Sequence, residues 1–520
     1  MKLNKIERLK QELAPIDYYK RLDRLKEEEL TDTDLFYLKN FGIYGLPSKP
    51  GFMLRIRVPA GRIEYLQIRK ILTKAGESDA RIILTARAQI ELHDLTLSQA
   101  IHIYKELKEA GLTTFATLVD NFRNIVTDPY DGVAKECAIE AWPLVQKMNE
   151  VVLQPSLLGM LPRKFNTAIV GMYKSAQSFF SNDAAFLLAK KEQKLGFNLY
   201  LGGKNSNLAQ DADIFVSKEE VIPLFEAVAK AYMRYGPRQK RTKARLFHLL
   251  EEIGLEGFKE KIKEFYPKPW RSSGSLLVGK EHSGLYKELS DGTFGYRYQT
   301  KFGEVTTTEL ETLLALAKEQ GAQIRLGIDQ NIYLVGVKEK IPPSPNPYVE
   351  MLVCAGSRYC IYSLFDTKKE ALSLVERVSK YPIRVGYSGC LKGCGRHITT
   401  DIGLVGIRTN NFGRVERGVR FFLGALYSRK RVEARLIFWA VPLRRLNDVM
   451  DVVLAEFKRS GFQDFEHFSE HILLKYEPEF LAWYILAKLD KKRLPPLGEI
   501  APKAIGHEEL KELEAHVFGS

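Results

Sequence analysis

Four of the five cysteines of this 520-residue chain fall into two close pairs. Cys354 and Cys360 bound the stretch CAGSRYC, and Cys390 and Cys394 lie in SGCLKGCGRH. Zinc sites mostly use gaps of about two to four residues in compact knuckles, which these spacings fit poorly. Four thiolates on two separate glycine-containing loops suit a cubane iron–sulfur cluster, because such loops let the backbone pass close to an inorganic core. The spacing therefore predicts a cluster held by all four cysteines, with four unrelated thiols as the alternative.

The composition is that of a large globular chain. With 45% hydrophobic residues it can bury sizeable cores and should divide into about two to four domains. The first residues, MKLNKIERLKQELAP, are charged and periodic rather than an apolar signal sequence, and no apolar run of about 18 residues occurs. We therefore expect a soluble, cytoplasmic protein. An odd count of cysteines in a reducing compartment argues against a disulfide framework, and we expect Cys137 to be a buried core thiol.

The charge balance is basic, with 78 Lys and Arg against 64 Asp and Glu and a net charge of +14. Nucleic acid is one class of acidic partner, but no helix-turn-helix, zinc-finger spacing or RNP-like motif supports it. An anionic substrate, a polycarboxylate cofactor or an acidic electron carrier would also explain the charge. A basic surface with no specific role is the alternative.

The elements that must position these cysteines belong to a duplicated chain. The segment from Met53 overlies the segment from Gly295 at an offset of 242 residues. The matched positions are Arg55 with Arg297, Gly61 with Gly303, Arg87 with Asp329, Gln89 with Asn331, and Ile90 with Ile332. Each copy reads as strand, helix, strand, with helices expected at residues 63–75 and 306–320.

A second pair of segments repeats at another offset. The segment from Lys164 overlies the segment from Pro382. The matched positions are Gly171 with Gly389, Asp183 with Asp401, Met172 with Cys390, and Ala176 with Cys394. Further on, GFNLYLGG resembles GVRFFLGA. The chain therefore reads as a duplicated two-part unit, A1-B1-A2-B2, in which only the later B copy keeps the thiols.

The stretch SGCLKGCGRHITTDIGL resembles the signature of the nitrite and sulfite reductases that contain sirohaem and a [4Fe-4S] cluster, and CAGSRYC is similar to that family's upstream cysteine pair. The resemblance extends from about Phe52 to Tyr476 and includes the internal duplication. It implies an α+β fold with two ferredoxin-like half-domains and two mixed α/β domains that carry sirohaem and cluster. It also implies that Cys354, Cys360, Cys390 and Cys394 bind the cluster and that Cys394 bridges it to the sirohaem iron.

The resemblance and the repeat together predict six segments. These are an N-terminal helical arm at 1–50, a first ferredoxin-like half-domain at 51–110, a sirohaem and substrate-pocket domain at 111–275, a second half-domain at 276–345, a [4Fe-4S] and sirohaem domain at 346–485, and a C-terminal tail at 486–520.

The family binds its oxyanion in a ring of basic side chains, because the anion's charge must be neutralised and its departing oxygens protonated. By resemblance, FMLRIRVPAGRI supplies Arg55, DNFRNIVTDP supplies Arg123, and LPRKFNTAIVG supplies Lys164 and Asn166. Sulfite reductases commonly carry a second lysine at the last of these positions and nitrite reductases an asparagine, so Asn166 favours nitrite.

Sirohaem carries eight carboxylates, and the family surrounds them with further basic groups. By resemblance, these are Arg87, His93, Arg241 and Lys243. The sequence departs from the family at Leu391 and Lys392, which replace the Pro and Asn that often follow the first cysteine of the signature pair. It departs again at Glu91, where an amide is common, and we expect Glu91 either to be protonated or to point elsewhere.

The resemblance thus implies a ferredoxin-dependent nitrite reductase of nitrate assimilation, which uses sirohaem to reduce nitrite to ammonia in a six-electron reaction. Sulfite reduction to sulfide is the alternative within the family, and a non-catalytic iron–sulfur binding protein is the alternative outside it. No flavin or nicotinamide motif is present, so an acidic ferredoxin is the expected electron donor. We expect a monomer that binds neither nucleic acid nor membranes.

Overall fold

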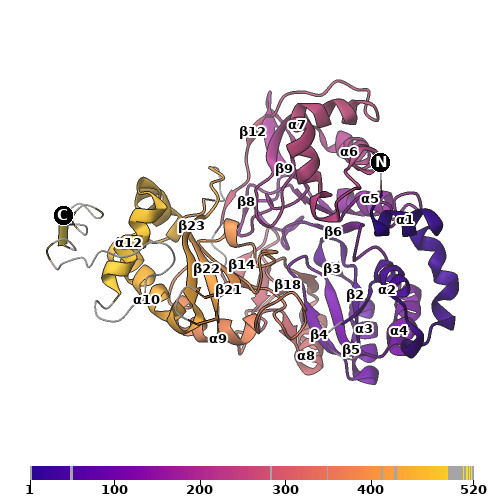
Figure 1. Cartoon of the computed structure of the whole chain (residues 1–520), viewed down its shortest axis with the longest axis horizontal. Coiled ribbons are helices and arrows are strands. Elements are labelled where there is room, and N and C mark those ends of the chain that lie inside the picture. Colours follow the sequence, from indigo (N-terminus) through magenta and orange to yellow (C-terminus); the bar gives the residue numbers. More distant parts are fainter. Residues whose placement is uncertain are drawn as a thin grey trace. The chain divides into compact units, whose positions relative to one another are not determined.

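The structure is a computed structural model that describes residues 3–46, 51–281, 284–347, 349–410, 414–426 and 430–489, together with residues 508, 511, 512, 515 and 517. The backbone divides into two compact units (Figure 1). Unit 1 comprises Met1–Lys204 and Leu208–Asn346, and unit 2 comprises Asn205–Asn207 and Pro347–Ser520. Among the described residues, no helix has both the length and the apolar character needed to cross a membrane.

Unit 1 contains two ferredoxin-like half-domains with the same order of elements, except that a further helix follows the last strand of the first half. The first consists of β1 (Ile43–Gly45), β2 (Phe52–Ile56), β3 (Arg62–Ile63), α3 (Tyr65–Ser78), β4 (Arg81–Leu84), β5 (Ile90–Leu95) and α4 (Leu97–Glu109). The second consists of β14 (Tyr286–Glu288), β15 (Phe294–Tyr298), β16 (Glu304–Val305), α8 (Thr307–Gln320), β17 (Gln323–Leu326) and β18 (Ile332–Val337). From β2 to β5, each element recurs 242 residues later with the same bounds, which confirms the A1–A2 repeat.

The two half-domains exchange a short strand. The first sheet has the order β1-β2-β5-β4-β16, and the second has the order β14-β15-β18-β17-β3. Strand β3 therefore completes the sheet of the second half, where Ile63 pairs with Ile324, and β16 completes the sheet of the first. This is why the helix expected at residues 63–75 begins only at Tyr65: Ile63 is in a strand, and Glu64 is the N-cap.

Unusual backbone conformations repeat with the same offset. Positive φ angles occur at matched positions in the two halves: Ala60 and Phe302, Gly61 and Gly303, Asp79 and Gly321, Ala88 and Gln330. The third pair ends α3 and α8 with left-handed C-caps. The helix expected at residues 306–320 begins one residue later, because Thr306 is its N-cap and forms a capping box with Glu309.

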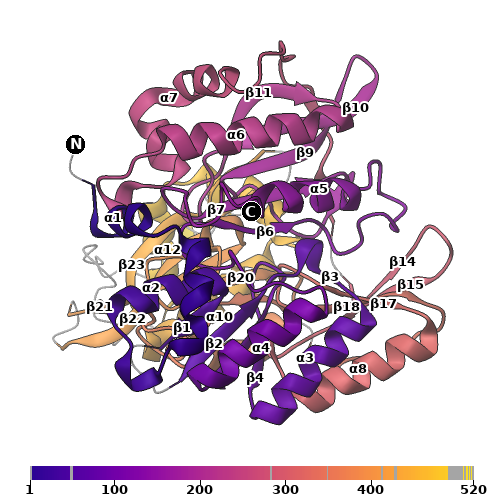
Figure 2. The ribbon, with the colours of Figure 1, turned by 90° about the vertical axis from the view of Figure 1, so that its right-hand side faces the viewer.

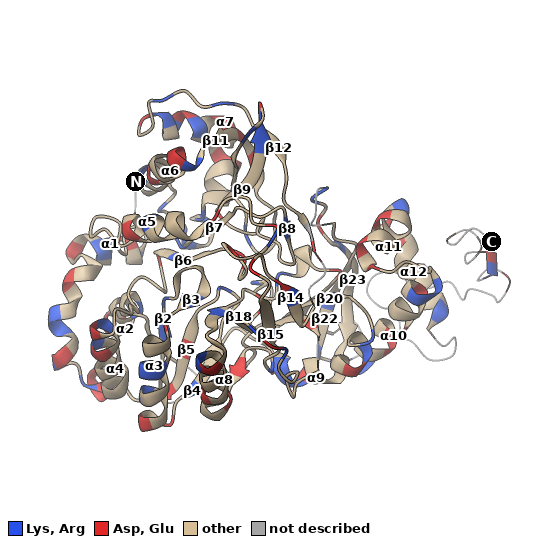
Figure 3. Cartoon of the chain, turned by 180° about the vertical axis from the view of Figure 1, so that it is seen from behind, with Lys and Arg blue, Asp and Glu red and all other residues tan. Residues whose placement is uncertain are grey.

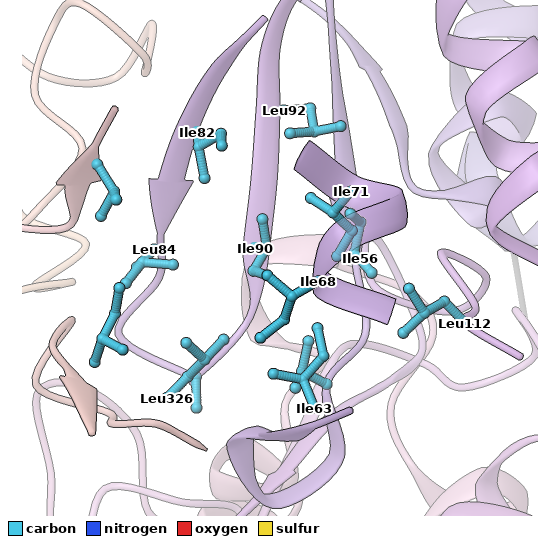
Figure 4. Close-up of a cluster of buried hydrophobic side chains, with 14 of the residues drawn as sticks. Ile56, Ile63, Ile68, Ile71, Ile82, Leu84, Ile90, Leu92, Leu112 and Leu326 are labelled. Atoms are coloured by element: carbon cyan, nitrogen blue, oxygen red, sulfur yellow. The ribbon is translucent and has the colours of Figure 1, made fainter. Parts of the chain in front are cut away.

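The apolar side chains of these elements form one core. Figure 4 shows part of it, where residues of α3 face residues of β2, β4 and β5. Its labelled members include Ile56, Ile68, Ile71, Ile90 and Leu92, each 2% exposed or less. Helices α3 and α8 lie side by side on the outside of the two sheets (Figure 2). The strands are buried along almost their whole length, and the apolar faces of the helices pack against them.

The B1 segment of unit 1 is a mixed sheet with helices. Its strands are β6 (Phe122–Val126), β7 (Phe165–Val170), β9 (Ala184–Lys191), β10 (Lys194–Leu201) and β11 (Gln210–Val216), in the order β11-β10-β9-β7-β6, with β12 (Ser275–Leu276) added to β9. A two-residue strand, β8 (Lys174–Ser175), pairs with β13 (Gly279–Lys280). The helices are α5 (Trp142–Val152), α6 (Val221–Tyr235) and α7 (Leu246–Lys263).

Unit 2 repeats this topology. Its sheet has the order β19-β20-β21-β22-β23, formed by β19 (Glu350–Val353), β20 (Arg384–Ser388), β21 (Ile402–Thr409), β22 (Glu416–Leu423) and β23 (Arg435–Pro442). In chain order, the first three strands of each sheet are parallel (β6, β7 and β9; β19, β20 and β21), and each of the last two is antiparallel to the strand before it (β10 and β11; β22 and β23). The helices are α9 (Thr367–Val378), α10 (Leu443–Arg459), α11 (Phe465–His471) and α12 (Pro478–Lys488).

One buried carboxylate marks the B1–B2 repeat at atomic detail. In unit 1, Asp183 accepts the backbone N–H of Asn166 at 2.7 Å. In unit 2, Asp401 accepts the backbone N–H of Arg384 at 2.8 Å. These are the positions that the sequence alignment superimposes, so the B1–B2 repeat is confirmed.

The segment preceding β1 is helical, with α1 (Lys5–Glu12), η1 (Pro15–Arg24) and α2 (Asp32–Leu38). Residues 1, 2 and 47–50 of the predicted N-terminal arm lie outside the described residues, as does most of the predicted tail at 486–520. The six segment boundaries remain predictions.

Candidate active site

The four paired cysteines follow the carboxyl ends of two neighbouring parallel strands in unit 2. Cys354 comes directly after β19, and Cys390 comes two residues after β20. In the register of these strands Val353 lies opposite Tyr387, and the Cys354 N–H donates to the Tyr387 carbonyl at 2.9 Å. Because carboxyl ends of parallel strands meet at one edge of a sheet, the topology brings the two loops together.

The thiols of the two loops face one another. The Cys354 Sγ accepts the Gly389 N–H at 3.1 Å, an amide from the loop of the other pair. Burial raises the pKa of the Cys360 and Cys390 thiols, and the nearby Cys354 contributes in the same direction to both. Cys394 is the exposed member of the set. The structure thus brings together at least three of the four predicted ligands.

The loops are built for close approach. A Cβ on Gly389 would lie 1.8 Å from the Ser363 Oγ, and one on Gly395 would lie 2.5 Å from the Tyr387 carbonyl oxygen. Only glycine fits at these two positions, and an amide aimed at a sulfur is typical of iron–sulfur loops. Four thiols on two neighbouring loops are a donor set that fits a thiolate-ligated iron–sulfur cluster spanning both loops.

The equivalent loop of the B1 segment has lost this chemistry. Met172, at the position of Cys390, is fully buried. Ala176, at the position of Cys394, lines a small cavity of about 60 Å³ beside Arg297 and Tyr333.

Cys137 is half-buried, not fully buried as expected, and its Sγ accepts the Gly132 N–H at 3.2 Å.

Three of the predicted substrate residues lie at the amino ends of neighbouring strands in unit 1. Arg123 is the second residue of β6, Asn166 is the second residue of β7, and Lys164 directly precedes β7. In the register, Phe122 lies opposite Phe165, so the three side chains belong to one edge of the B1 sheet. Arg123 and Lys164 are half-buried, and Asn166 is 5% exposed.

Arg123 is surrounded by positive charge. Its Nη1 donates to the Thr117 carbonyl at 2.7 Å and its Nη2 to the Val119 carbonyl at 3.0 Å, while its buried Nε has no hydrogen-bond partner among the described residues. Burial lowers its pKa well below the ordinary arginine value, and nearby arginines lower it further. We call Arg123 and the three arginines whose charges act on it the arginine cluster: Arg55, Arg87, Arg123 and Arg163. Such a concentration of charge suits an anion.

Val119 is held in an unusual conformation beside Arg123. Its φ of 48° is rare for a β-branched residue. The same residue offers its carbonyl to the Arg123 guanidinium. The loop therefore stores backbone strain where it orients this side chain.

Arg55 is paired with a carboxylate. It stands directly opposite Glu91 on the neighbouring strand β5, and its Nε donates to the Glu91 Oε1 at 2.7 Å. The other oxygen of Glu91 lies 2.9 Å from the His93 Nε2. Burial opposes ionisation, but the Arg55 charge and the His93 contact lower the pKa of Glu91 to about 2. The first alternative, a protonated Glu91, is therefore wrong, whereas the contacts with Arg55 and His93 agree with the second, a side chain that points to protein partners.

Arg87 connects the first half-domain to the B1 sheet. Its Nη1 donates to the Asn182 Oδ1 at 3.0 Å, and its Nη2 donates to the Asn124 and Thr167 carbonyls at 2.7 and 3.3 Å. His93, which is also predicted to lie near sirohaem, is 1% exposed. These two residues thus have firm structural contacts, and their roles toward sirohaem remain predictions.

Arg241 and Lys243 lie in different settings. Arg241 forms a two-pronged pair with the Asp120 carboxylate at 2.7 and 2.8 Å, whereas Lys243 is exposed. Asp120 is completely buried and also pairs with Lys10 at 2.8 Å and Arg163 at 3.3 Å. The sequence interpretation missed Asp120 and Arg163. Both adjoin residues that it did use, since Asp120 begins DNFRN and Arg163 precedes Lys164.

The two departures in the signature loop lie at the surface of unit 2. Leu391 is 60% exposed, and the Lys392 Nζ lies over the ring of Tyr362. Tyr362 is itself half-exposed and close in sequence to Cys360. Both departures therefore lie on the outer surface of the cysteine loops, and the Lys392 charge is close enough to lower the pKa of the Cys360 and Cys390 thiols against the larger effect of burial.

Comparisons with known proteins agree with this geometry. The nitrite and sulphite reductase 4Fe-4S domain matches residues 118–269, and the nitrite/sulfite reductase ferredoxin-like half domain matches residues 44–110 and 287–342. Together these ranges cover more than half of the chain. The first range is the B1 copy, which lacks the paired cysteines, so the ligand set itself rests on the geometry of unit 2.

Several curated relatives align over most of the chain. The ferredoxin–nitrite reductase of Synechococcus elongatus is 29% identical over 90% of this chain and 98% of its own length. That of Leptolyngbya laminosa is 27% identical over 87% and 97%, and the chloroplastic enzyme of Arabidopsis thaliana is 29% identical over 72% and 70%.

The solved structure of the Mycobacterium tuberculosis NirA protein is similar in fold, with a TM-score of 0.83 over 92% of this chain and 97% of that one, at 22% identity. The duplicated α+β architecture, the matched domains and the two cysteine loops lead to one conclusion: the chain belongs to the family of nitrite and sulfite reductases that contain sirohaem and a [4Fe-4S] cluster.

Proposed function

We propose that this chain reduces nitrite to ammonia in a six-electron reaction, with sirohaem and a [4Fe-4S] cluster as cofactors and ferredoxin as the electron donor. The observation that carries the proposal is the arginine cluster around Arg123, a half-buried residue whose guanidinium is fixed by two backbone carbonyls and whose Nε has no hydrogen-bond partner among the described residues. A cluster-binding protein without turnover has no use for such a site. The curated relatives named ferredoxin–nitrite reductase, which align over most of the chain, support the choice of nitrite.

The substrate residues divide into guanidinium groups that neutralise charge and a lysine that can donate a proton. Arg55 and Arg123 supply guanidinium groups whose planar donor geometry suits an oxyanion. Lys164 supplies an ammonium group that can donate a proton as an oxygen leaves as water. Asn166 adds no charge, which matches an anion with a single negative charge. In this proposal the four residues bind and orient nitrite and protonate it.

The resemblance to the family also assigns the residues that would hold the two cofactors. Cys354, Cys360, Cys390 and Cys394 would hold the cluster, with Cys394 as the ligand shared with sirohaem. Arg87, His93, Arg241 and Lys243 would lie near the sirohaem carboxylates. When bound, sirohaem supplies an iron that binds the substrate anion, and the cluster supplies single electrons.

The electron donor and the location of the protein belong to the same proposal. The net charge of +14 suits an acidic ferredoxin. We place the enzyme in the cytoplasm as a monomer that binds neither nucleic acid nor membranes.

The test uses the purified holoprotein, reduced ferredoxin and isotopically labelled nitrite. The proposal expects labelled ammonium, with about six ferredoxins oxidised per ammonium formed. A parallel reaction with sulfite measures sulfide. Efficient sulfide formation with slow nitrite turnover would replace the proposed substrate by sulfite, and no turnover of either anion would contradict the enzymatic function.

A further inference from the structure

Glu91 occupies a position from which it controls Arg55. The two residues are directly opposed on β2 and β5, and both the Nε and the Nη2 of Arg55 contact the Oε1 of Glu91. The Oε2 contacts the His93 Nε2 at 2.9 Å. Only 7% of the Glu91 side chain is exposed, against 22% of the Arg55 side chain. Glu91 thus holds Arg55 from the buried side, and part of the Arg55 side chain remains accessible.

The second half-domain offers a natural comparison. Arg297 matches Arg55, and its Nη2 pairs with the Asp329 Oδ2 at 2.7 Å. Asp329 occupies the position that Arg87 takes in the first half, and its Oδ2 also accepts from the Tyr333 hydroxyl at 2.7 Å. Only 4% of the Arg297 side chain is exposed. An arginine–carboxylate pair therefore occurs in each half, but only the pair formed by Glu91 keeps its arginine accessible.

Glu91 also changes the charge of the arginine cluster. Asp120, the other carboxylate near Arg123, already pairs with three cations. Glu91 contacts Arg55 directly and cancels one of the cluster's positive charges. A carboxylate near a bound anion disfavours a dianion about twice as much as a monoanion, because the Coulomb energy scales with the charge of the anion.

We propose that Glu91 is a positioning residue that sets substrate specificity: it fixes the Arg55 guanidinium and lowers the charge of the arginine cluster, so that the site selects a monoanion such as nitrite over a dianion such as sulfite. The inference rests on the proposed function and deepens it. It assigns a role to a residue where this sequence departs from the amide common in its family.

The test compares Glu91→Gln with the wild-type holoprotein. Glutamine keeps the size of the side chain and an oxygen that accepts from Arg55, but it removes the charge. Two quantities are measured: the dissociation constants of nitrite and sulfite from the absorbance change of the oxidised protein without turnover, and the kcat/KM ratio with one common donor. We expect the sulfite-to-nitrite ratio of kcat/KM to rise by about tenfold. We expect the sulfite-to-nitrite ratio of dissociation constants to fall by about the same factor.

Two further variants separate this role from a structural one. Glu91→Asp keeps the charge, so it should retain the wild-type ratio of dissociation constants even if both anions bind more weakly. Asp329→Asn removes the matched carboxylate of the second half and should leave the ratio unchanged. Thermal unfolding of each variant identifies any loss of folding.

The outcomes distinguish the inference from the proposed function. Unchanged ratios in Glu91→Gln, or an equal shift in Glu91→Asp, would overturn the role of Glu91 while nitrite reduction by the wild type stands. If the wild type does not reduce nitrite, the proposed function fails, and the ratio of dissociation constants still decides the inference. Failure of the wild type to bind either anion would overturn both.

Discussion

Arg123 is half-buried with other arginines nearby, and the resulting concentration of charge is the clearest chemical feature of unit 1. Its guanidinium is held by the Thr117 and Val119 carbonyls, so its orientation is set by the protein and not by a ligand. Preorganised donors of this kind stabilise charge without reorganisation at the moment of reaction. At the scale of single residues, substrate choice then depends on how many charges surround this guanidinium.

Asn166→Lys tests that dependence. The Asn166 backbone N–H is fixed by Asp183, whose carboxylate is also bound by Arg245 at 2.6 and 3.0 Å. Because Asp183 is already paired, a lysine at position 166 must direct its charge elsewhere. We expect the sulfite-to-nitrite ratio of kcat/KM to rise about tenfold, which corresponds to about 1.4 kcal/mol. Asn166→Gln is the neutral control, and an equal shift in both variants would show that size rather than charge matters.

Cys390→Ser tests the cluster ligands. The thiol lies on the loop whose Gly389 amide points to the Cys354 sulfur, so its loss should remove one of four ligands. We expect iron and acid-labile sulfide to fall to a small fraction of the wild-type content. Cys137→Ser is the matched control and should retain both. Full iron and sulfide in Cys390→Ser would contradict the assignment.

At the scale of elements, the exchanged strands β3 and β16 connect the two half-domains. Each follows a glycine with a positive φ that contacts the other half. A Cβ on Gly61 would lie 2.0 Å from the Leu326 carbonyl oxygen, and one on Gly303 would lie 2.5 Å from the Leu84 carbonyl oxygen. Each turn therefore packs against a carbonyl group of the other half-domain, and neither position has room for a side chain.

Replacing either glycine by alanine should loosen both half-domains. For Gly61→Ala and Gly303→Ala we expect the free energy of unfolding to fall by about 2–4 kcal/mol, from positive-φ strain and the close contact. The measurement is urea unfolding followed by circular dichroism. Gly76→Ala is the control, since it lies within helix α3 with nothing within 4 Å, and should be neutral or stabilising. Equal stability of all three variants would show that the exchanged strands contribute little.

Much of this architecture could be predicted from sequence, for identifiable reasons. The offset of 242 residues is visible because matched turns need the same glycines, as at Gly61 and Gly303. The cysteine pairs are visible because four of the five cysteines of the chain fall within two short stretches. The strand exchange was not predictable, because the partner of a two-residue strand is chosen by the packing of distant segments. The ionised state of Glu91 was missed for a similar reason, since it depends on a cross-strand arginine.

At the scale of the whole molecule, charge is the property that bears on partners. Figure 3 shows Lys and Arg on many of the surface helices, including α9, α10 and α12 of unit 2, mixed with acidic residues. The net charge is nevertheless +14. A basic enzyme attracts an acidic protein donor over a distance that salt shortens to about 10 Å at 0.1 M.

The rate of reduction by ferredoxin should therefore fall steeply as ionic strength rises. The measurement is the second-order rate constant for nitrite-dependent ferredoxin oxidation at several salt concentrations. A small neutral artificial donor serves as the control and should show a much weaker dependence, because it has no charge to be attracted. Equal salt dependence for the two donors would show that the basic surface does not steer ferredoxin.

The absorption spectrum of the purified protein, recorded before and after addition of nitrite, tests the central claim most directly. The claim is that one chain combines sirohaem, a [4Fe-4S] cluster and a cationic site for nitrite. We predict that sirohaem absorption is present and that nitrite shifts it at concentrations that also support turnover. A protein with full cluster iron but no sirohaem absorption, or with sirohaem absorption that nitrite leaves unchanged, would contradict it.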